Sequence, residues 1–259
     1  DGVGELLSQN TLNNLDADSL IEVTADTIER DATWSPGLKY LILGNLTVKG
    51  TDGADSVTTL TLEPGVEMRM TKYRQFNVGA SSGDPGALAA QGTSTNPILF
   101  TSNESSPAVG DWYYIKIDNT SDDATTVMEH CVVEYGGYGQ GAIYLNNASP
   151  AIADTTIRHS KYAGIYMNSS SPTIKDCTFS DNNGYGINMS TSSPTLSNCT
   201  FSNSGNFDLY YSGTPGGTVS GCTINNGLYV NSGVPGAITG NTINYNAGYP
   251  IRIGADGVG

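Results

Sequence analysis

The 259-residue sequence contains few charged residues, and basic ones are especially rare. Lys and Arg together number 11 against 25 Asp and Glu, so the formal charge is −14, and charged residues make up only 14% of the chain. A surface of this charge repels the phosphate backbone of nucleic acids, so we expect no nucleic-acid partner. The sequence also lacks a run of 18 apolar residues, so we expect no membrane insertion.

Cysteine and histidine are also scarce, with four Cys and two His. Cys177, Cys199 and Cys222 recur at nearly constant spacing, and three neighbours in a row cannot all form disulfides. Parallel side chains on adjacent strands would also strain a disulfide. We therefore expect a stack of buried free thiols that has no redox or metal-binding role.

A sequence repeat organises the region from Ser149 to Ile253. Pro150, Pro172 and Pro194 are 22 residues apart, and Pro215 and Pro235 follow at slightly shorter intervals. A unit this short cannot bury its own apolar face, so it must stack on its neighbours. Apolar and polar residues alternate within each unit, which indicates β-strands. Equivalent strands recur in one chain direction and must therefore pair in parallel, with right-handed connections.

These features predict an all-β fold consisting of a single right-handed parallel β-helix over residues 1–259. We expect about ten coils, irregular in the N-terminal half and of regular 22-residue length in the C-terminal half. Aligning the repeats gives inward-facing columns that would form the core, and a corner column of residues that tolerate a left-handed backbone. The corner column consists of His130, Asp154, Asp176, Asn198, Gly221 and Gly240.

Several segments resemble those of a known family. They include Gly44–Val48, Leu60–Val66, Gly86–Thr93, Asn96–Ser102 and Gly110–Trp112, followed by the 22-residue repeats. On these segments the chain is similar to the right-handed parallel β-helix repeat proteins of microbial cell surfaces and secretions. The resemblance implies a pectate-lyase-like scaffold and an extracellular or cell-surface location. The chain departs from the usual pattern where Tyr113 and Tyr114 replace small glycines.

Polysaccharide lyases and hydrolases use this fold, so a catalytic cluster is one possible interpretation of the charged residues. The residues that would form one follow the second inward column in neighbouring coils, where a carboxylate could tune a histidine for proton transfer. They are Glu134, Arg158, His159, Lys161 and Asp181. The alternative interpretation is a solvated corner with one modest ion pair. We favour the second interpretation and expect no catalytic site.

A row of aromatic residues is the stronger functional candidate. One outward column contains Tyr144, Tyr166, Tyr210 and Tyr229, with Lys116 and Arg252 in the same column. At the adjacent corner Tyr162, Tyr185, Phe207 and Tyr249 recur at similar places. Such rows stack on sugar rings or contact a partner protein. Alternatively, the tyrosines only stabilise one another across the sheet, by roughly 0.2–1 kcal/mol per pair.

Acidic turns provide oxygen atoms that would suit calcium. The candidate ligands are Asp16, Asp18, Asp52, Asp55, Asp122 and Asp123. None of these turns has the full ligand spacing of a calcium-binding loop, so we expect no cofactor and keep calcium as the alternative.

The two ends of the sequence resemble each other, since Asp1–Gly4 recurs as Asp256–Gly259. We also match Leu20–Val23 with Ile251–Ile253. These matches predict one module of a longer tandem array, with neighbouring modules or other copies stacking end to end, and we find no signal peptide in the given chain. The predicted function is a non-catalytic cell-surface module, a rigid spacer or adhesin-like rod that binds glycan or protein. The alternative is a carbohydrate-active enzyme, either a lyase or a glycoside hydrolase.

Overall fold

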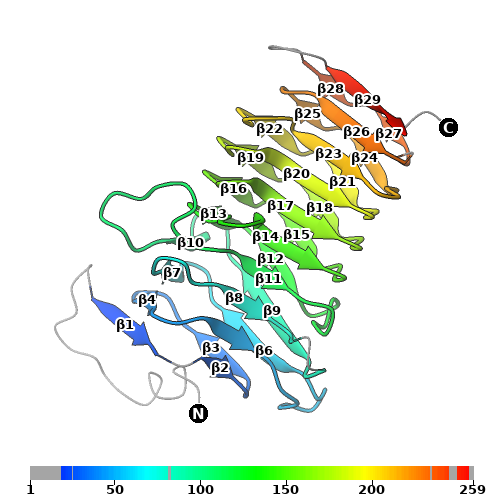
Figure 1. Cartoon of the computed structure of the whole chain (residues 1–259). Coiled ribbons are helices and arrows are strands. Elements are labelled where there is room, and N and C mark those ends of the chain that lie inside the picture. Colours follow the sequence, from blue (N-terminus) through cyan, green and yellow to red (C-terminus); the bar gives the residue numbers. More distant parts are fainter. Residues whose placement is uncertain (1–18, 25, 81–82, 234, 245–249, 257–259) are drawn as a thin grey trace.

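The computed structural model describes residues 19–24, 26–80, 83–233, 235–244 and 250–256, and all its regular structure is β-strand. Three sheets, each of parallel strands only, wind around one axis, and successive strands of the chain enter the three sheets in turn (Figure 1). In this part of the chain there is no helical segment capable of crossing a lipid bilayer.

Sheet 1 contains ten strands. They are β1 (Leu20–Val23), β4 (Lys39–Ile42), β7 (Glu67–Met70), β10 (Ile98–Ser102), β13 (Cys131–Glu134), β16 (Thr156–Arg158), β19 (Thr178–Ser180), β22 (Thr200–Ser202), β25 (Thr223–Ile224) and β28 (Thr242–Ile243).

Sheet 2, which faces the viewer in Figure 1, also contains ten strands. They are β2 (Thr27–Ile28), β5 (Leu46–Val48), β8 (Phe76–Val78), β11 (Ile115–Ile117), β14 (Gly141–Asn146), β17 (Ala163–Asn168), β20 (Tyr185–Ser190), β23 (Leu209–Ser212), β26 (Leu228–Ser232) and β29 (Ile251–Asp256).

Sheet 3 contains nine strands. They are β3 (Ala32–Trp34), β6 (Thr58–Leu62), β9 (Gly86–Gln91), β12 (Val127–Glu129), β15 (Ala151–Ala153), β18 (Thr173–Lys175), β21 (Thr195–Ser197), β24 (Thr218–Ser220) and β27 (Ile238–Thr239).

The core consists of ladders of apolar side chains that point inward from each sheet. In sheet 2, Ile143 pairs with Ile165, which pairs with Ile187, and all three are fully buried. In sheet 1, the buried rings of Phe179 and Phe201 stack at 4.7 Å between centroids. The predicted inward columns are confirmed, because in-register pairing places like residues on like residues.

The predicted corner column is also confirmed. His130, Asp154, Asp176 and Asn198 have φ between 47° and 55°, and Gly221 continues the column with φ 65°. This left-handed conformation costs most residues roughly 1–2 kcal/mol and is adopted most readily by Gly, Asn and Asp. The repeat of these residue types in the sequence therefore marks a turn of the solenoid.

All four cysteines are buried and free. The backbone amide of Cys199 donates a hydrogen bond to Sγ of Cys222 at 3.3 Å, and that of Cys131 donates to Oγ1 of Thr155 at 3.2 Å. The cysteines therefore occupy one interior file, as the repeat predicts. Burial raises the pKa of the Cys131 thiol to about 12.

One alignment made from the sequence is wrong. Leu20–Val23 forms β1 in sheet 1, whereas Ile251–Ile253 belongs to β29 in sheet 2. The two segments share an apolar–polar alternation, which does not distinguish one sheet of a solenoid from another. Asp1–Gly4 lies outside the described residues.

Candidate functional site

The outward column of sheet 2 has the predicted order. Lys116 pairs with Tyr144 and Tyr144 with Tyr166, then Asn188 interrupts the aromatic row before Tyr210. Tyr229 and Arg252 complete the column. Since the strands are about 4.8 Å apart, these side chains form a continuous stripe along the axis of the solenoid.

On the N-terminal side of Asn188, six tyrosines are in contact with one another. We call them the proximal aromatic cluster: Tyr73, Tyr113, Tyr114, Tyr138, Tyr144 and Tyr166. The ring of Tyr138 meets those of Tyr73 and Tyr113 edge-on, at 5.2 and 5.5 Å between centroids. Tyr114 bridges Tyr113 to Tyr144, so residues from turns join the residues of the sheet.

On the C-terminal side of Asn188 lies the distal aromatic cluster, formed by Tyr185, Phe207, Tyr210 and Tyr229. The guanidinium of Arg252 lies 4.6 Å from the centroid of the Tyr229 ring, within the range of a cation–π interaction. Tyr210 is partly buried, and this burial raises the pKa of its hydroxyl.

Tyr162 lies near the position that Tyr185 occupies in the next coil, but not at it. Tyr185 pairs with Ala163, so Tyr162 lies one residue before the position that Tyr185 occupies. Tyr162 is 49% exposed, and Lys161 Nζ lies 6.0 Å from its ring centroid. Tyr162 therefore lies at the edge of the aromatic surface. Tyr249 lies outside the described residues.

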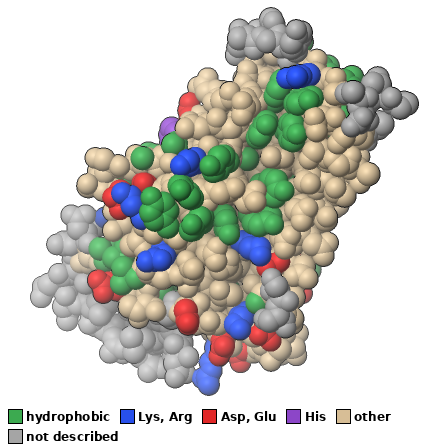
Figure 2. All heavy atoms as spheres, viewed as in Figure 1, with side chains coloured by type: hydrophobic (Ala, Val, Ile, Leu, Met, Phe, Trp, Pro, Cys, Tyr) green, Lys and Arg blue, Asp and Glu red, His purple; other side chains and the backbone are tan. Residues whose placement is uncertain are grey.

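The surroundings of the aromatic clusters contain few acidic groups. The strands of sheet 2 from β2 to β26 contain no Asp or Glu. Asp118, directly after β11, is buried and accepts hydrogen bonds from Lys116 Nζ at 2.6 Å and Asn146 Nδ2 at 2.7 Å. Figure 2 shows the resulting face, a band of hydrophobic side chains with Lys and Arg among them.

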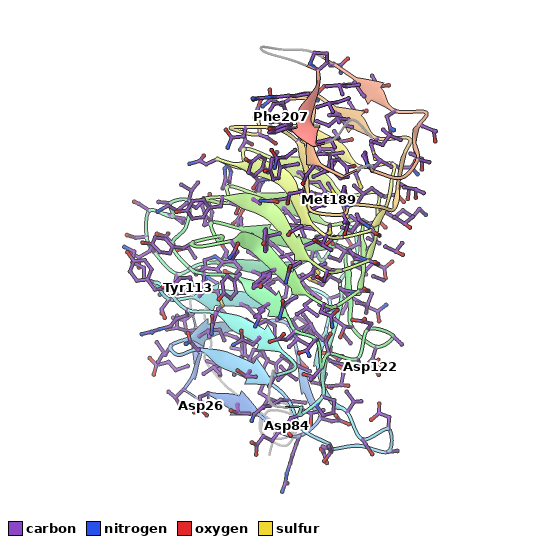
Figure 3. The ribbon with its side chains drawn as sticks, turned by 45° about the vertical axis from the view of Figure 1, so that its right-hand side comes forward. Asp26, Asp84, Tyr113, Asp122, Met189 and Phe207 are labelled. Atoms are coloured by element: carbon purple, nitrogen blue, oxygen red, sulfur yellow. The ribbon has the colours of Figure 1, made fainter. Side chains whose placement is uncertain are left out.

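Sequence reasoning placed Tyr138 only in a longer loop at this corner, and it missed Tyr73. Tyr73 and Tyr138 come from turns before β8 and β14, where the repeat length is irregular. The available signal was the pair Tyr113–Tyr114, which precedes β11 directly. Figure 3 places Tyr113 on the side of the solenoid opposite Asp122.

The proposed catalytic cluster contains one strong ion pair. Arg158 lies beside Glu134, with Nη2 at 2.6 Å and Nε at 2.7 Å from Oε2. Thr101 Oγ1 donates to the other carboxylate oxygen at 2.8 Å. Glu134 is only 8% exposed. Arg158 balances its charge, and both carboxylate oxygens accept hydrogen bonds.

The remaining members of that cluster have separate partners. The His159 ring stacks on Tyr135 at 5.2 Å, Asp181 accepts a hydrogen bond from Asn203 Nδ2 at 3.0 Å, and Lys161 Nζ lies 4.2 Å from the Tyr138 ring centroid. Within the described part of the chain no hydrogen bond or ion pair joins the side chains of His159 and Asp181. Both residues have left-handed φ, 53° and 54°, and therefore form a second corner.

The acidic turns hold their carboxylates with backbone amides. The amide of Asp31 donates to Asp52 and that of Val57 to Asp55, while Thr125 donates to Asp122 and Ser149 to Asp123. Calcium at these turns stays the alternative to the prediction of no cofactor. Asp16 and Asp18 lie outside the described residues.

A further group of potential ligands lies at the corner between sheets 3 and 1. Glu129, His130 and Asp154 each offer one ligand atom, and the three atoms lie within 4.8 Å of one another. The sequence alignment identified His130 and Asp154 only as corner residues. The signal that it missed is Glu129, which lies in the adjacent column and points to the same side.

Two family models match the chain. The family described as right-handed beta helix region matches residues 113–258, and that described as pectate-lyase like beta helix domain matches residues 26–170. Neither a search of curated proteins nor a search of solved structures finds a match. Each family model covers more than half of the chain and agrees with the three parallel sheets, so the chain belongs to the right-handed β-helix proteins with a pectate-lyase-like scaffold.

Proposed function

We propose that this protein is a non-catalytic module of an extracellular or cell-surface protein, which binds glycan or a surface protein through the aromatic face of sheet 2. The observation that carries the proposal is the stripe of two aromatic clusters on a sheet whose strands are free of acidic residues from β2 to β26. In a chain of formal charge −14 this face differs from the average surface.

The chemistry of the face suits either class of ligand. Tyrosine rings offer apolar surface to the C–H groups of a sugar, and their hydroxyls donate and accept hydrogen bonds. Exposed aromatic patches also form the centres of protein interfaces. The parallel ladder fixes the spacing of the rings, so little side-chain entropy is lost when a ligand binds. A rigid solenoid that carries such a face can serve as a spacer or an adhesin-like rod.

Binding to a glycan array and to candidate surface proteins tests this proposal. Tyr166→Ala and Tyr210→Ala each remove one ring from one cluster, and we expect each to reduce binding at least tenfold. Tyr135→Asn removes a tyrosine from the corner after β13, outside the aromatic clusters, and is expected to leave binding unchanged. Equal binding by all four proteins would contradict the proposal.

The second candidate function is polysaccharide cleavage, favoured by the match of residues 26–170 to a pectate-lyase-like family. Glu134, Arg158, His159 and Lys161 lie in that range. Polyuronates and neutral glycans are the substrates to test, with His159→Ala and Asp181→Ala as variants. Turnover that these two changes abolish would replace the binding function with an enzymatic one.

A further inference from the structure

Several carboxylates of the described residues have a cationic partner. Glu134 pairs with Arg158, Asp118 with Lys116 and Asp176 with Lys175. The group formed by Glu129, His130 and Asp154 differs. In the described part of the chain no Lys or Arg forms an ion pair with it, and its side chains have one hydrogen bond, from Gln91 Nε2 to Glu129 Oε2 at 3.3 Å.

The backbone holds the three side chains together. Glu129 ends β12, His130 forms the corner that follows, and Asp154 forms the same corner one coil later. His130 and Asp154 have nearly identical φ of 47° and 48°, and the His130 amide donates to the carbonyl of Ala153 at 3.2 Å. Register therefore places Asp154 directly above His130, and the chain places Glu129 beside it.

We propose that Glu129, His130 and Asp154 bind a first-row divalent cation of the Zn²⁺ type. One imidazole and two carboxylates are ligands that Zn²⁺ accepts, whereas Ca²⁺ takes oxygen ligands only. Zn²⁺ bonds to nitrogen and carboxylate oxygen are about 2.0–2.2 Å long. The three ligand atoms already lie within 4.8 Å of one another, so small side-chain rotations bring them onto one ion.

The ion would balance two carboxylate charges and connect two consecutive coils at one corner. Three protein ligands leave the fourth position of a tetrahedral ion to water. The rest of the corner column lacks this chemistry, because Asp176 is paired with Lys175 at 3.2 Å and Asn198, Gly221 and Gly240 follow. The site is thus confined to the coils of β12 and β15. It is also separate from the aromatic face, which belongs to sheet 2.

Isothermal titration calorimetry of the full chain, freed of affinity tags and treated with chelator, tests this site with ZnCl₂ as the probe. We expect one saturable site, and weakening of its affinity by tenfold or more in His130→Asn and Asp154→Asn. Asparagine suits both positions because Asn198 occupies the same column with φ 55°. Glu129→Gln, in a regular strand, gives a third variant with no change at the corner.

Two variants serve as matched controls. Asp176→Asn changes the next carboxylate of the same column, and His159→Asn changes the other histidine at a different corner with φ 53°. Both are expected to keep the affinity within twofold, and CaCl₂ is not expected to compete. The absence of saturable binding, or equal loss in the controls and the three site variants, would overturn the proposal.

Discussion

The inward ladder of sheet 2 contains a hydroxyl group for which the interior offers no partner. Tyr211 pairs with Met189 and Val230, is 1% exposed, and its hydroxyl forms no hydrogen bond with any described residue. A buried polar group without a partner costs about 1–3 kcal/mol. We therefore predict that Tyr211→Phe raises the free energy of unfolding by about 1 kcal/mol, measured by urea denaturation.

Tyr40 is the matched control for this prediction. It is also fully buried, but its hydroxyl donates to the carbonyl of Ser35 at 3.0 Å and accepts from the Ser35 amide at 3.1 Å. Tyr40→Phe therefore leaves two backbone groups unpaired and should lower the free energy of unfolding. A similar loss in both variants would show that the Tyr211 hydroxyl has a partner.

Two buried aspartates should respond to pH in opposite directions. Burial raises the pKa of Asp208, although Ser204 Oγ and two backbone amides donate to it. Burial also acts on Asp118, but hydrogen bonds from Lys116 and Asn146 hold its pKa below the usual value. A raised carboxyl pKa means that the folded state binds more protons, so stability falls as pH rises through that pKa. A lowered pKa means that stability is lost as pH falls.

Unfolding free energies measured from pH 3 to pH 7 test this assignment. As pH rises above about 3.9, the pKa of Asp in the unfolded chain, the wild type should lose stability relative to Asp208→Asn. The wild type should instead gain stability relative to Asp118→Asn as pH rises through the acidic range. If the stability differences of the two variants change with pH in the same direction, the opposite pKa shifts of Asp208 and Asp118 are contradicted.

At the scale of strands and corners, the third corner of the coil contains a residue that is poorly suited to its conformation. Asn147, Ser169, Thr191 and Gly213 follow successive strands of sheet 2, and all have positive φ. Thr191 has φ 49°, and a β-branched residue is a genuine outlier there. We predict that Thr191→Asn raises the free energy of unfolding by about 1 kcal/mol.

Thermal and urea unfolding check this prediction, with Thr195→Asn as the matched control. Thr195 is exposed like Thr191 but lies in β21, where β-branched residues are favoured. The control should therefore lose stability. A gain of equal size in both variants would mean that the corner conformation is not the cause.

The regular coils could be predicted in detail because in-register stacking converts a sequence spacing directly into a contact. Tyr144, Tyr166 and Tyr210 of the outward column, and Cys177 and Cys199 of the interior file, follow from the 22-residue spacing. The corner of His130 and Asp154 could be predicted for the same reason, since only a few residue types tolerate positive φ. Where the coils have equal length, aligning one residue in each coil fixes the pairing of all the others.

Contacts between turns of unequal length could not be predicted in this way. Tyr73 approaches Tyr138 although the two residues come from coils of irregular length, so no constant spacing relates them. The Glu129–His130–Asp154 group was not predicted because His130 and Asp154 were explained by the corner conformation alone and Glu129 was not considered.

At the scale of the whole molecule, the inward-facing apolar column of sheet 2 becomes exposed to solvent at the last described strand, β29. Leu228 and Val230 in β26 are 2% and 4% exposed, whereas their partners Ile251 and Ile253 in β29 are 51% and 55% exposed. Among the described strands, β29 is also the last of its sheet, and a strand edge is a template for another strand. Stacking of a further coil on this end would bury both side chains.

We therefore predict that the protein self-associates as its concentration rises, in sedimentation-velocity experiments, and that Ile251→Lys and Ile253→Lys each weaken this association. A lysine at either position places a charge in the apolar contact, which costs several kcal/mol unless it is paired. Tyr162→Lys is the matched control, because Tyr162 is 49% exposed but lies on the side of the solenoid. If wild type and all three variants associate equally, the contact lies elsewhere, and a wild type that stays monomeric at every concentration removes the end of sheet 2 as an interface between copies.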